Sequence, residues 1–180
     1  ELITLVLEEI DRVNGVVENL LSFARPFDPE RVWVTAGDLL RRLAALIDPL
    51  AIRENIHLRV SGDQDAQLCV DENQIQQVLM NLALNSIQAM PEGGELDLEV
   101  QTIKEQTVIT VSDTGTGMAP EALERATEPF YTTRTQGTGL GLSISKRLVQ
   151  LNSGNLQISS EPGAGTRVSL TFNASKDLHE

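Results

Sequence analysis

Residues 72–90 carry the pattern most suggestive of chemistry. Apolar residues return at helical spacing and form one face, made by Ile75, Val78, Leu79, Leu82 and Ile87. A second stripe on the same helix consists of uncharged amides: Gln74, Gln77, Asn81, Asn85 and Gln88. Asparagine is a poor helix former, and two carboxamides one turn apart offer neutral oxygens that suit a hydrated Mg²⁺ beside phosphates. The alternative is a neutral, solvated surface stripe.

Two glycine-rich segments suit other parts of a nucleotide. Residues 113–117 read Asp-Thr-Gly-Thr-Gly and follow a predicted strand, so Asp113 could accept a hydrogen bond from the amine of adenine, or the segment could be an ordinary turn. Residues 137–143 read Gly-Thr-Gly-Leu-Gly-Leu-Ser and open a predicted helix, where backbone N–H groups favour phosphate; the alternative is a flexible entry to that helix. They match neither a Walker loop nor the dinucleotide fingerprint, because no Gly-Lys follows and position 142 is Leu.

The composition excludes several classes of function. The chain has 180 residues, 26 Asp+Glu and 14 Lys+Arg, which gives a net charge of −12 and argues against nucleic acid or an anionic membrane as partner. With 41% hydrophobic residues it can form one full domain with a core. Cys69, His57 and His179 are too few for a zinc site or a disulfide. No apolar run approaches the roughly 18 residues that span a bilayer, so we expect a soluble, cytoplasmic domain.

Residues 1–26 are predicted to form one long helix. Apolar residues alternate at spacings of three and four, as in a coiled-coil seam: Ile3, Val6, Ile10, Val13, Val17, Leu20 and Ala24. Arg25-Pro26 ends the pattern, because the residue before proline avoids helical geometry. We expect part of a helical bundle that continues before Glu1; a long helix packed on its own domain is the alternative.

The remaining elements predict an α+β domain with helices on one face of a sheet. We expect a helix after Thr35 and Asp38, which have capping-box spacing, and expect Pro49 to kink or end it. Gly154 suits the end of the last helix. Residues 96–102 with 107–112, and 155–160 with 166–172, read as hairpins. The other predicted strands are residues 31–35, 56–60 and 68–70, and the other helices residues 72–90 and 142–151.

Taken together in this order, the motifs resemble the ATP-binding catalytic domain of sensor histidine kinases. Residues 81–89 resemble that family's N box, 113–118 its G1 box, 128–134 its F box, 137–143 its G2 box, and 163–166 its last glycine motif. Residues 20–26 resemble the end of the second helix of the kinases' dimerisation and phosphotransfer bundle, and residues 87–91 with 130–133 resemble the nitrogen-regulation branch.

The resemblance implies a Bergerat-type fold and a set of site residues. The fold is a two-layer α/β sandwich with a mixed sheet over residues 27–175, preceded by the bundle helix of residues 1–26 and followed by a tail of residues 176–180. Asn85, supported by Asn81, would hold Mg²⁺, while Asp113 would bind adenine, and residues 127–137 would form a lid. Arg134 would meet the γ-phosphate as the catalytic lid residue. The other implied ATP-binding residues are Gln88, Ala89, Gly115, Gly117, Met118, Thr132, Thr133, Gly137, Thr138, Gly139, Leu140, Gly141, Leu142 and Thr166.

Two departures from the family pattern shape the functional expectation. Gln88 stands where many members carry Lys or Arg, which removes one potential phosphate contact. The acceptor motif is missing, because His57 lies in a predicted strand and His179 in the tail. We therefore expect ATP and Mg²⁺ as ligands, and an acceptor His on a bundle helix absent from this chain. The expected partners are a response regulator receiver domain and a second copy in the full-length protein, which could be anchored in the inner membrane.

Three alternative functions are less compatible with the sequence. ATP hydrolases of this fold place Glu four residues before the metal-binding Asn, where this chain has Asn81, which cannot act as a base. A serine kinase of the same fold is less compatible with the helix ending in Arg25-Pro26. A non-catalytic module that binds ATP and dimerises is the third reading, against which the glycine segments and Arg134 argue.

Overall fold

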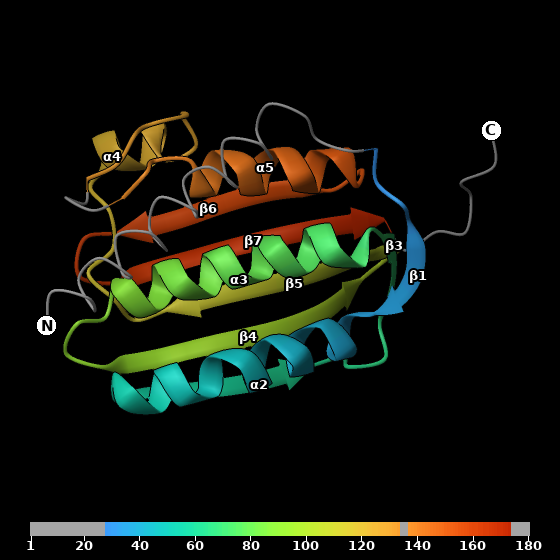
Figure 1. Ribbon diagram of the computed structural model, residues 1–180, viewed down its shortest axis with the longest axis horizontal. Coiled ribbons are helices and arrows are strands. Elements are labelled where there is room, and N and C mark those ends of the chain that lie inside the picture. The colour runs from blue at the N-terminus through green and yellow to red at the C-terminus, as the bar shows by residue number, and fades with distance from the viewer. Residues whose placement is uncertain (1–27, 134–136, 174–180) are drawn as a thin grey trace, which may run out of the picture.

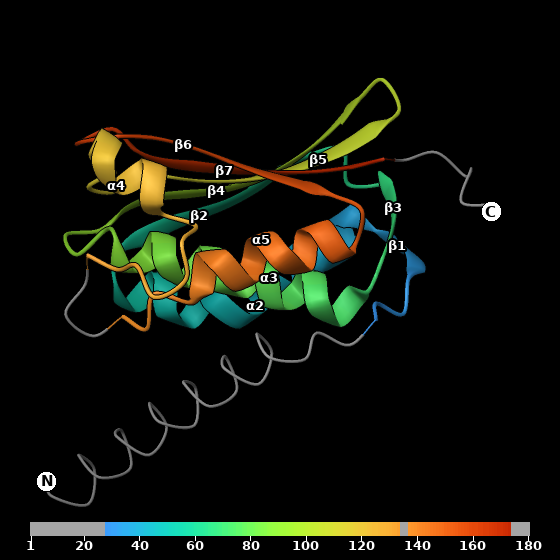
Figure 2. The same cartoon turned by 90° about the horizontal axis from the view of Figure 1, so that it is seen from above.

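The computed structural model describes residues 28–133 and 137–173, which form a sheet layer and a helix layer (Figures 1 and 2). The predicted helix over residues 1–26, Arg134 and the tail lie outside the described residues. The strands are β1 Val32–Thr35, β2 Ile56–Gly62, β3 Gln67–Val70, β4 Gly94–Ile103, β5 Gln106–Asp113, β6 Asn155–Glu161 and β7 Gly165–Asn173. The helices are α2 Ala36–Arg53, α3 Glu72–Gln88, α4 Pro120–Arg125 and α5 Gly141–Leu151.

The main sheet is mixed, with the order β2-β4-β5-β7-β6. Both predicted hairpins, β4–β5 and β6–β7, are present, and β5 pairs with β7 antiparallel. β2 and β4 run parallel, which requires the crossover through β3 and α3. The α+β prediction with helices on one face is confirmed, because α2, α3 and α5 cover the same side of the sheet (Figure 2). β1 pairs antiparallel with β3 in a separate two-stranded sheet, which was not predicted.

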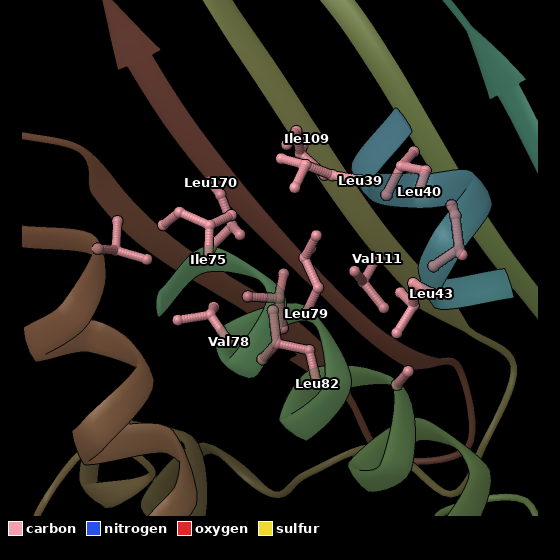
Figure 3. Packing of buried hydrophobic residues seen from close by; sticks show 14 of the residues in the cluster. Leu39, Leu40, Leu43, Ile75, Val78, Leu79, Leu82, Ile109, Val111 and Leu170 are labelled. Atoms are coloured by element: carbon pink, nitrogen blue, oxygen red, sulfur yellow. The ribbon is translucent and has the colours of Figure 1, made fainter. Parts of the chain in front are cut away.

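The core lies between the sheet and the three covering helices (Figure 3). Alternate residues of β4 and β5 point into it, as a pleated strand requires, while the helices contribute one apolar stripe each. The apolar face predicted for α3 is buried throughout, as are its partners on the sheet: Ile75, Val78, Leu79, Leu82, Leu96, Leu98, Val100, Ile109, Val111 and Leu170. This packing fixes the rotation of α3 and therefore the direction in which its amide stripe faces.

α2 differs from the prediction at two points, the helix end expected at Pro49 and the capping box. The helix continues past Pro49 to Arg53. Ala45, whose carbonyl loses its partner, and Pro49 are both exposed, so water can replace the missing hydrogen bond. The capping box does not form either, because Thr35 is the N-cap without a side-chain cap bond. The Thr35 hydroxyl instead accepts a hydrogen bond from the Gln67 amide across the β1–β3 pair.

The end of α5 also differs from the prediction. The residue in left-handed conformation is Ser153, with φ of 58°, and not Gly154. The Gly154 N–H still donates to the Val149 carbonyl at 2.9 Å, as in a Schellman ending. Glycine is required at position 154 for space, because a Cβ there would lie 2.6 Å from the Phe172 ring.

Among the described residues, no helix combines the length and the apolar character that crossing a membrane requires.

Candidate functional site

A cavity of about 850 Å³ opens where the C-terminal end of α3, the start of α5 and the strands β6 and β7 meet. Residues from the N-box, G1, F-box and G2 segments all line it, although they lie far apart in the sequence. Of the predicted site residues, those that line the cavity are Asn81, Asn85, Gln88, Ala89, Asp113, Gly117, Met118, Thr132, Thr133, Gly137, Thr138, Gly139, Gly141, Leu142 and Thr166.

Three predicted site residues have other positions. Leu140 is 2% exposed and belongs to the hydrophobic core, where it holds the start of α5 in place. Gly115 is not part of the lining but lies against α3: a Cβ there would be 2.6 Å from the Ala89 carbonyl oxygen. Arg134 lies outside the described residues, so its predicted role stays a prediction.

Asp113 ends β5 and is 7% exposed, which makes it the buried carboxylate of the cavity. Its Oδ1 accepts hydrogen bonds from two backbone N–H groups, that of Gly115 at 3.0 Å and that of Thr166 at 3.2 Å. Both bonds use the same oxygen, so Oδ2 can accept a hydrogen bond from a ligand amine. The backbone thus holds the carboxylate in a fixed orientation at the cavity wall.

The G1 loop is fixed between α3 and the β6–β7 turn. The Thr116 N–H donates to the Ala89 carbonyl at 3.0 Å, and the Met118 N–H donates to the Ser160 hydroxyl at 2.9 Å. Gly117 has φ of 65°, and a Cβ there would lie 1.9 Å from the Glu161 carbonyl oxygen. Glycine at 117 therefore serves both the turn and the close backbone approach.

Replacing Gly117 by Ala is expected to destabilise the fold more than the same change at Gly163. Both residues have positive φ, 65° and 74°, so both substitutions strain the backbone by about 1 kcal/mol. Only Gly117 also brings its Cβ against backbone, whereas nothing lies within 4 Å of a Cβ at Gly163. Urea unfolding of the two variants measures the difference, and equal free energies of unfolding would contradict the close approach.

Asn81 connects α3 and α5, the two helices that line this end of the cavity. Its amide nitrogen donates to the Ser145 hydroxyl of α5 at 2.9 Å. A Cβ on Gly141, the first residue of α5, would lie only 2.5 Å from Asn81 Oδ1, so α5 begins in direct contact with this side chain. Asn81 therefore positions α5, while Asn85, one turn further along α3, lines the cavity.

The start of α5 is suited to an anionic ligand. Its N-cap, Leu140, provides no side-chain cap bond, and Gly141 and Leu142 line the cavity. The first N–H groups of a helix have no partner within the helix and carry a partial positive charge. The backbone here can consequently bind phosphate oxygens without a basic side chain.

Several residues of the lining had no role predicted from the sequence. The predicted roles included no residue of α4 and none for Thr116, yet Ala122 and Thr116 both line the cavity. Tyr131 does so as well, and the Arg125 guanidinium lies 4.2 Å from the centroid of its ring, a cation–π contact. The position of Tyr131 within the F-box segment could have identified it as a lining residue. Nothing in the sequence indicated its contact with Arg125.

Within residues 28–133 and 137–173, no three His, Cys, Asp or Glu side chains gather in a way that could hold a metal ion. In that same part of the chain, Asp113 is the one charged residue of the cavity lining. A metal ion here would depend on amide oxygens such as that of Asn85 and on oxygens of the ligand itself.

Comparison with known proteins agrees with the motifs. Residues 70–176 match the family model described as histidine kinase-, DNA gyrase B- and HSP90-like ATPase. Sporulation kinase C of Bacillus subtilis is 35% identical over 164 residues, which cover 90% of this chain and 38% of the kinase. The sensor histidine kinase ZraS of Salmonella typhimurium is 32% identical over 167 residues, 92% of this chain and 36% of ZraS. The chain thus spans less than two fifths of the length of these relatives.

Solved structures show the same fold. The catalytic domain of the histidine kinase ThkA superposes with a TM-score of 0.74 at 26% identity, covering 81% of this chain and 96% of that domain. Full-length ShkA, solved in complex with AMPPNP, gives a TM-score of 0.84 at 29% identity, over 96% of this chain and 38% of ShkA. These findings confirm the Bergerat-type fold. The chain therefore belongs to the family of histidine kinase-, DNA gyrase B- and HSP90-like ATPases, and within it to the ATP-binding catalytic domains of sensor histidine kinases.

Proposed function

We propose that this chain binds Mg-ATP in the cavity and donates the γ-phosphoryl group to a histidine on a bundle helix that the described residues do not contain. The observation that carries the proposal is the convergence of Asp113, Asn85 and the start of α5 on one cavity. The same cavity is thus lined by a carboxylate that can accept the adenine amine, an amide that suits a metal ion, and a helix start that suits phosphate.

Asp113 would select adenine. Oδ1 of the carboxylate accepts hydrogen bonds from two backbone N–H groups, and Oδ2 can accept one from the exocyclic amine of adenine. Guanine carries a carbonyl oxygen at the corresponding ring position, which a buried carboxylate repels. Binding of the base would also bury the ring beside Met118 and Ile158, which line the cavity.

The phosphates would be bound chiefly by backbone and metal. The described lining contains no Lys or Arg, and its α3 part carries the uncharged Gln88. The uncapped start of α5 supplies N–H groups, and the Asn85 oxygen suits Mg²⁺ held mainly by phosphate oxygens and water. When bound, Mg²⁺ would neutralise phosphate charge and so favour departure of ADP.

Transfer to histidine, and not to water, is supported by Asn81. A hydrolase needs a base near the γ-phosphate, whereas the Asn81 amide has no basic lone pair at neutral pH and donates to Ser145. In the proposed reaction an imidazole nitrogen forms a bond to the γ-phosphorus as the bond to the bridging oxygen of ADP breaks. The chain's own residues orient the triphosphate for this in-line displacement.

Neither histidine of the sequence suits the acceptor role. His57 is an exposed residue of a strand, β2, whereas the family's acceptor lies on a helix, and His179 lies outside the described residues. We propose that the phosphoryl group passes from the bundle histidine to an aspartate of a response regulator. The ThkA kinase has been solved in complex with the response regulator TrrA, which supports a partner of this class.

Two experiments test the proposal: calorimetric titration of ATP, and then an assay of phosphoryl transfer. ATP is expected to bind the unaltered chain at one site, and more tightly with Mg²⁺ than with EDTA. The chain should then transfer the γ-phosphoryl group to a supplied bundle fragment of a related kinase carrying the acceptor histidine. Absence of ATP binding would contradict the proposed site, whereas binding without transfer to any such fragment would leave a module that binds ATP but donates no phosphate.

A further inference from the structure

A network of hydrogen bonds joins the chain segment before β1 to α3 and α5, at the end of the molecule opposite α4 (Figure 2). We call it the linker clasp, and it consists of Glu30, Arg31, Asp71, Gln74 and Asn152. None of these residues lines the nucleotide cavity.

Asn152 is the centre of the clasp. It is 2% exposed, and its side chain is fully used in hydrogen bonds. Its Oδ1 accepts the Asp71 N–H at 2.7 Å, and its Nδ2 donates to Gln74 Oε1 at 2.8 Å and to the Leu148 carbonyl at 2.9 Å. One buried amide thus binds the start of α3 to the end of α5.

The segment before β1 is bound to the same point. The Arg31 guanidinium donates to the Leu151 carbonyl, the last of α5, at 2.6 Å. The Glu30 N–H donates to Asp71 Oδ2 at 3.0 Å, while Asp71 Oδ1 accepts the Gln74 N–H and caps α3. A cation at the end of a helix also interacts favourably with its dipole.

The helices α3 and α5 are antiparallel and are bridged at both ends. At the far end the bridge is Asn152 with Gln74, and at the cavity end it is Asn81 with Ser145. Along α3, the clasp and Asn85 are about 20 Å apart, at 1.5 Å per residue. The two packed helices therefore form a contiguous path of contacts between the clasp and the cavity.

We propose that the linker clasp positions the nucleotide site: by holding the far ends of α3 and α5, residues 30–31 set the spacing between Asn85 and the start of α5. Arg31 and Asn152 are then positioning residues for ATP binding. The inference rests on the proposed ATP binding.

Replacing Arg31 by Met tests the clasp while keeping an unbranched apolar side chain. The variant is expected to bind Mg-ATP on the order of five-fold more weakly, a coupling typical of distant sites. Arg31→Lys keeps a charged donor and should recover part of the loss. Arg53→Met is the matched control, because Arg53 is an exposed arginine of α2 that pairs with Glu54, and its affinity should not change.

Reciprocal coupling gives a readout that a purely structural role does not predict. In the unaltered chain, Mg-ATP should slow hydrogen exchange of the Glu30 amide, which donates a hydrogen bond to Asp71 Oδ2. The Asp63 amide, which donates to the Val100 carbonyl at the sheet edge, is the reference and should be slowed less. In Asn152→Asp this difference should disappear, because the donor to Gln74 is lost.

The outcomes separate the two proposals. The clasp inference alone would be overturned by the following set of results. The unaltered chain binds ATP, the ATP affinity of Arg31→Met lies within two-fold of that of the unaltered chain, and Mg-ATP slows hydrogen exchange equally at the Glu30 and Asp63 amides. An unaltered chain that does not bind ATP would overturn the proposed function, and the positioning role with it.

Discussion

Asp113→Asn is expected to weaken ATP binding by on the order of 100-fold and to leave the fold intact. Asparagine has the same shape, and its Oδ1 can still accept the N–H groups of Gly115 and Thr166, so the G1 loop keeps its conformation. The second oxygen is replaced by an NH₂ group, so two hydrogen-bond donors, this group and the adenine amine, would face each other. A ligand contact is thus lost and a repulsive one is gained, in a buried position where water cannot compensate.

Titration calorimetry with ATP, together with thermal unfolding, measures both parts of this prediction. Asp48→Asn is a suitable control, because Asp48 is an exposed carboxylate of α2 and its loss changes the net charge equally. ATP affinity of the Asp113 variant equal to that of the control would reject the adenine site. A large fall in melting temperature would show instead that the charge, and not only the shape, of Asp113 holds the loop.

The second large effect is expected for Asn85→Ala in the presence of Mg²⁺. Asn85 lines the cavity, whose described lining has no basic side chain and no acidic cluster that could hold a metal. Without the Asn85 oxygen, the variant should bind ATP equally in Mg²⁺ and in EDTA. Phosphoryl transfer to a supplied bundle fragment should fall by on the order of 100-fold, because metal neutralisation of the phosphates is lost.

Asn73→Ala provides the matched control for this experiment. Asn73 is an exposed asparagine in the first turn of the same helix, so the change in helix propensity is comparable while the cavity is untouched. If Asn85→Ala kept the full gain in affinity that Mg²⁺ gives the unaltered chain, the metal would have to be held elsewhere. The difference between Mg²⁺ and EDTA is thus the decisive quantity, and not the affinity itself.

Local patterns made much of the fold predictable. The apolar period of α3, the alternation in β4 to β7 and the glycines before α5 report burial and backbone freedom, which are properties of a residue and its near neighbours. Most of the motif residues that line the cavity were named from the resemblance to histidine kinases, which could be recognised because each motif is a short run of adjacent residues. Pro49 and Gly154 were misread because solvent exposure of Ala45 and the position of the Phe172 ring are not local properties.

The sequence by itself determined the class of fold, most of the described helices and strands, although not α4, and the identity of the motifs. The tertiary structure decided which of those motif residues share a cavity, that Asn81 bridges to Ser145, and that Gly117 passes within contact of the Glu161 carbonyl. It also brought Arg31 to the end of α5, 120 residues away in the chain. The physical reason is that periodicity encodes which face is buried, whereas contacts between distant segments depend on how all the buried faces pack at once.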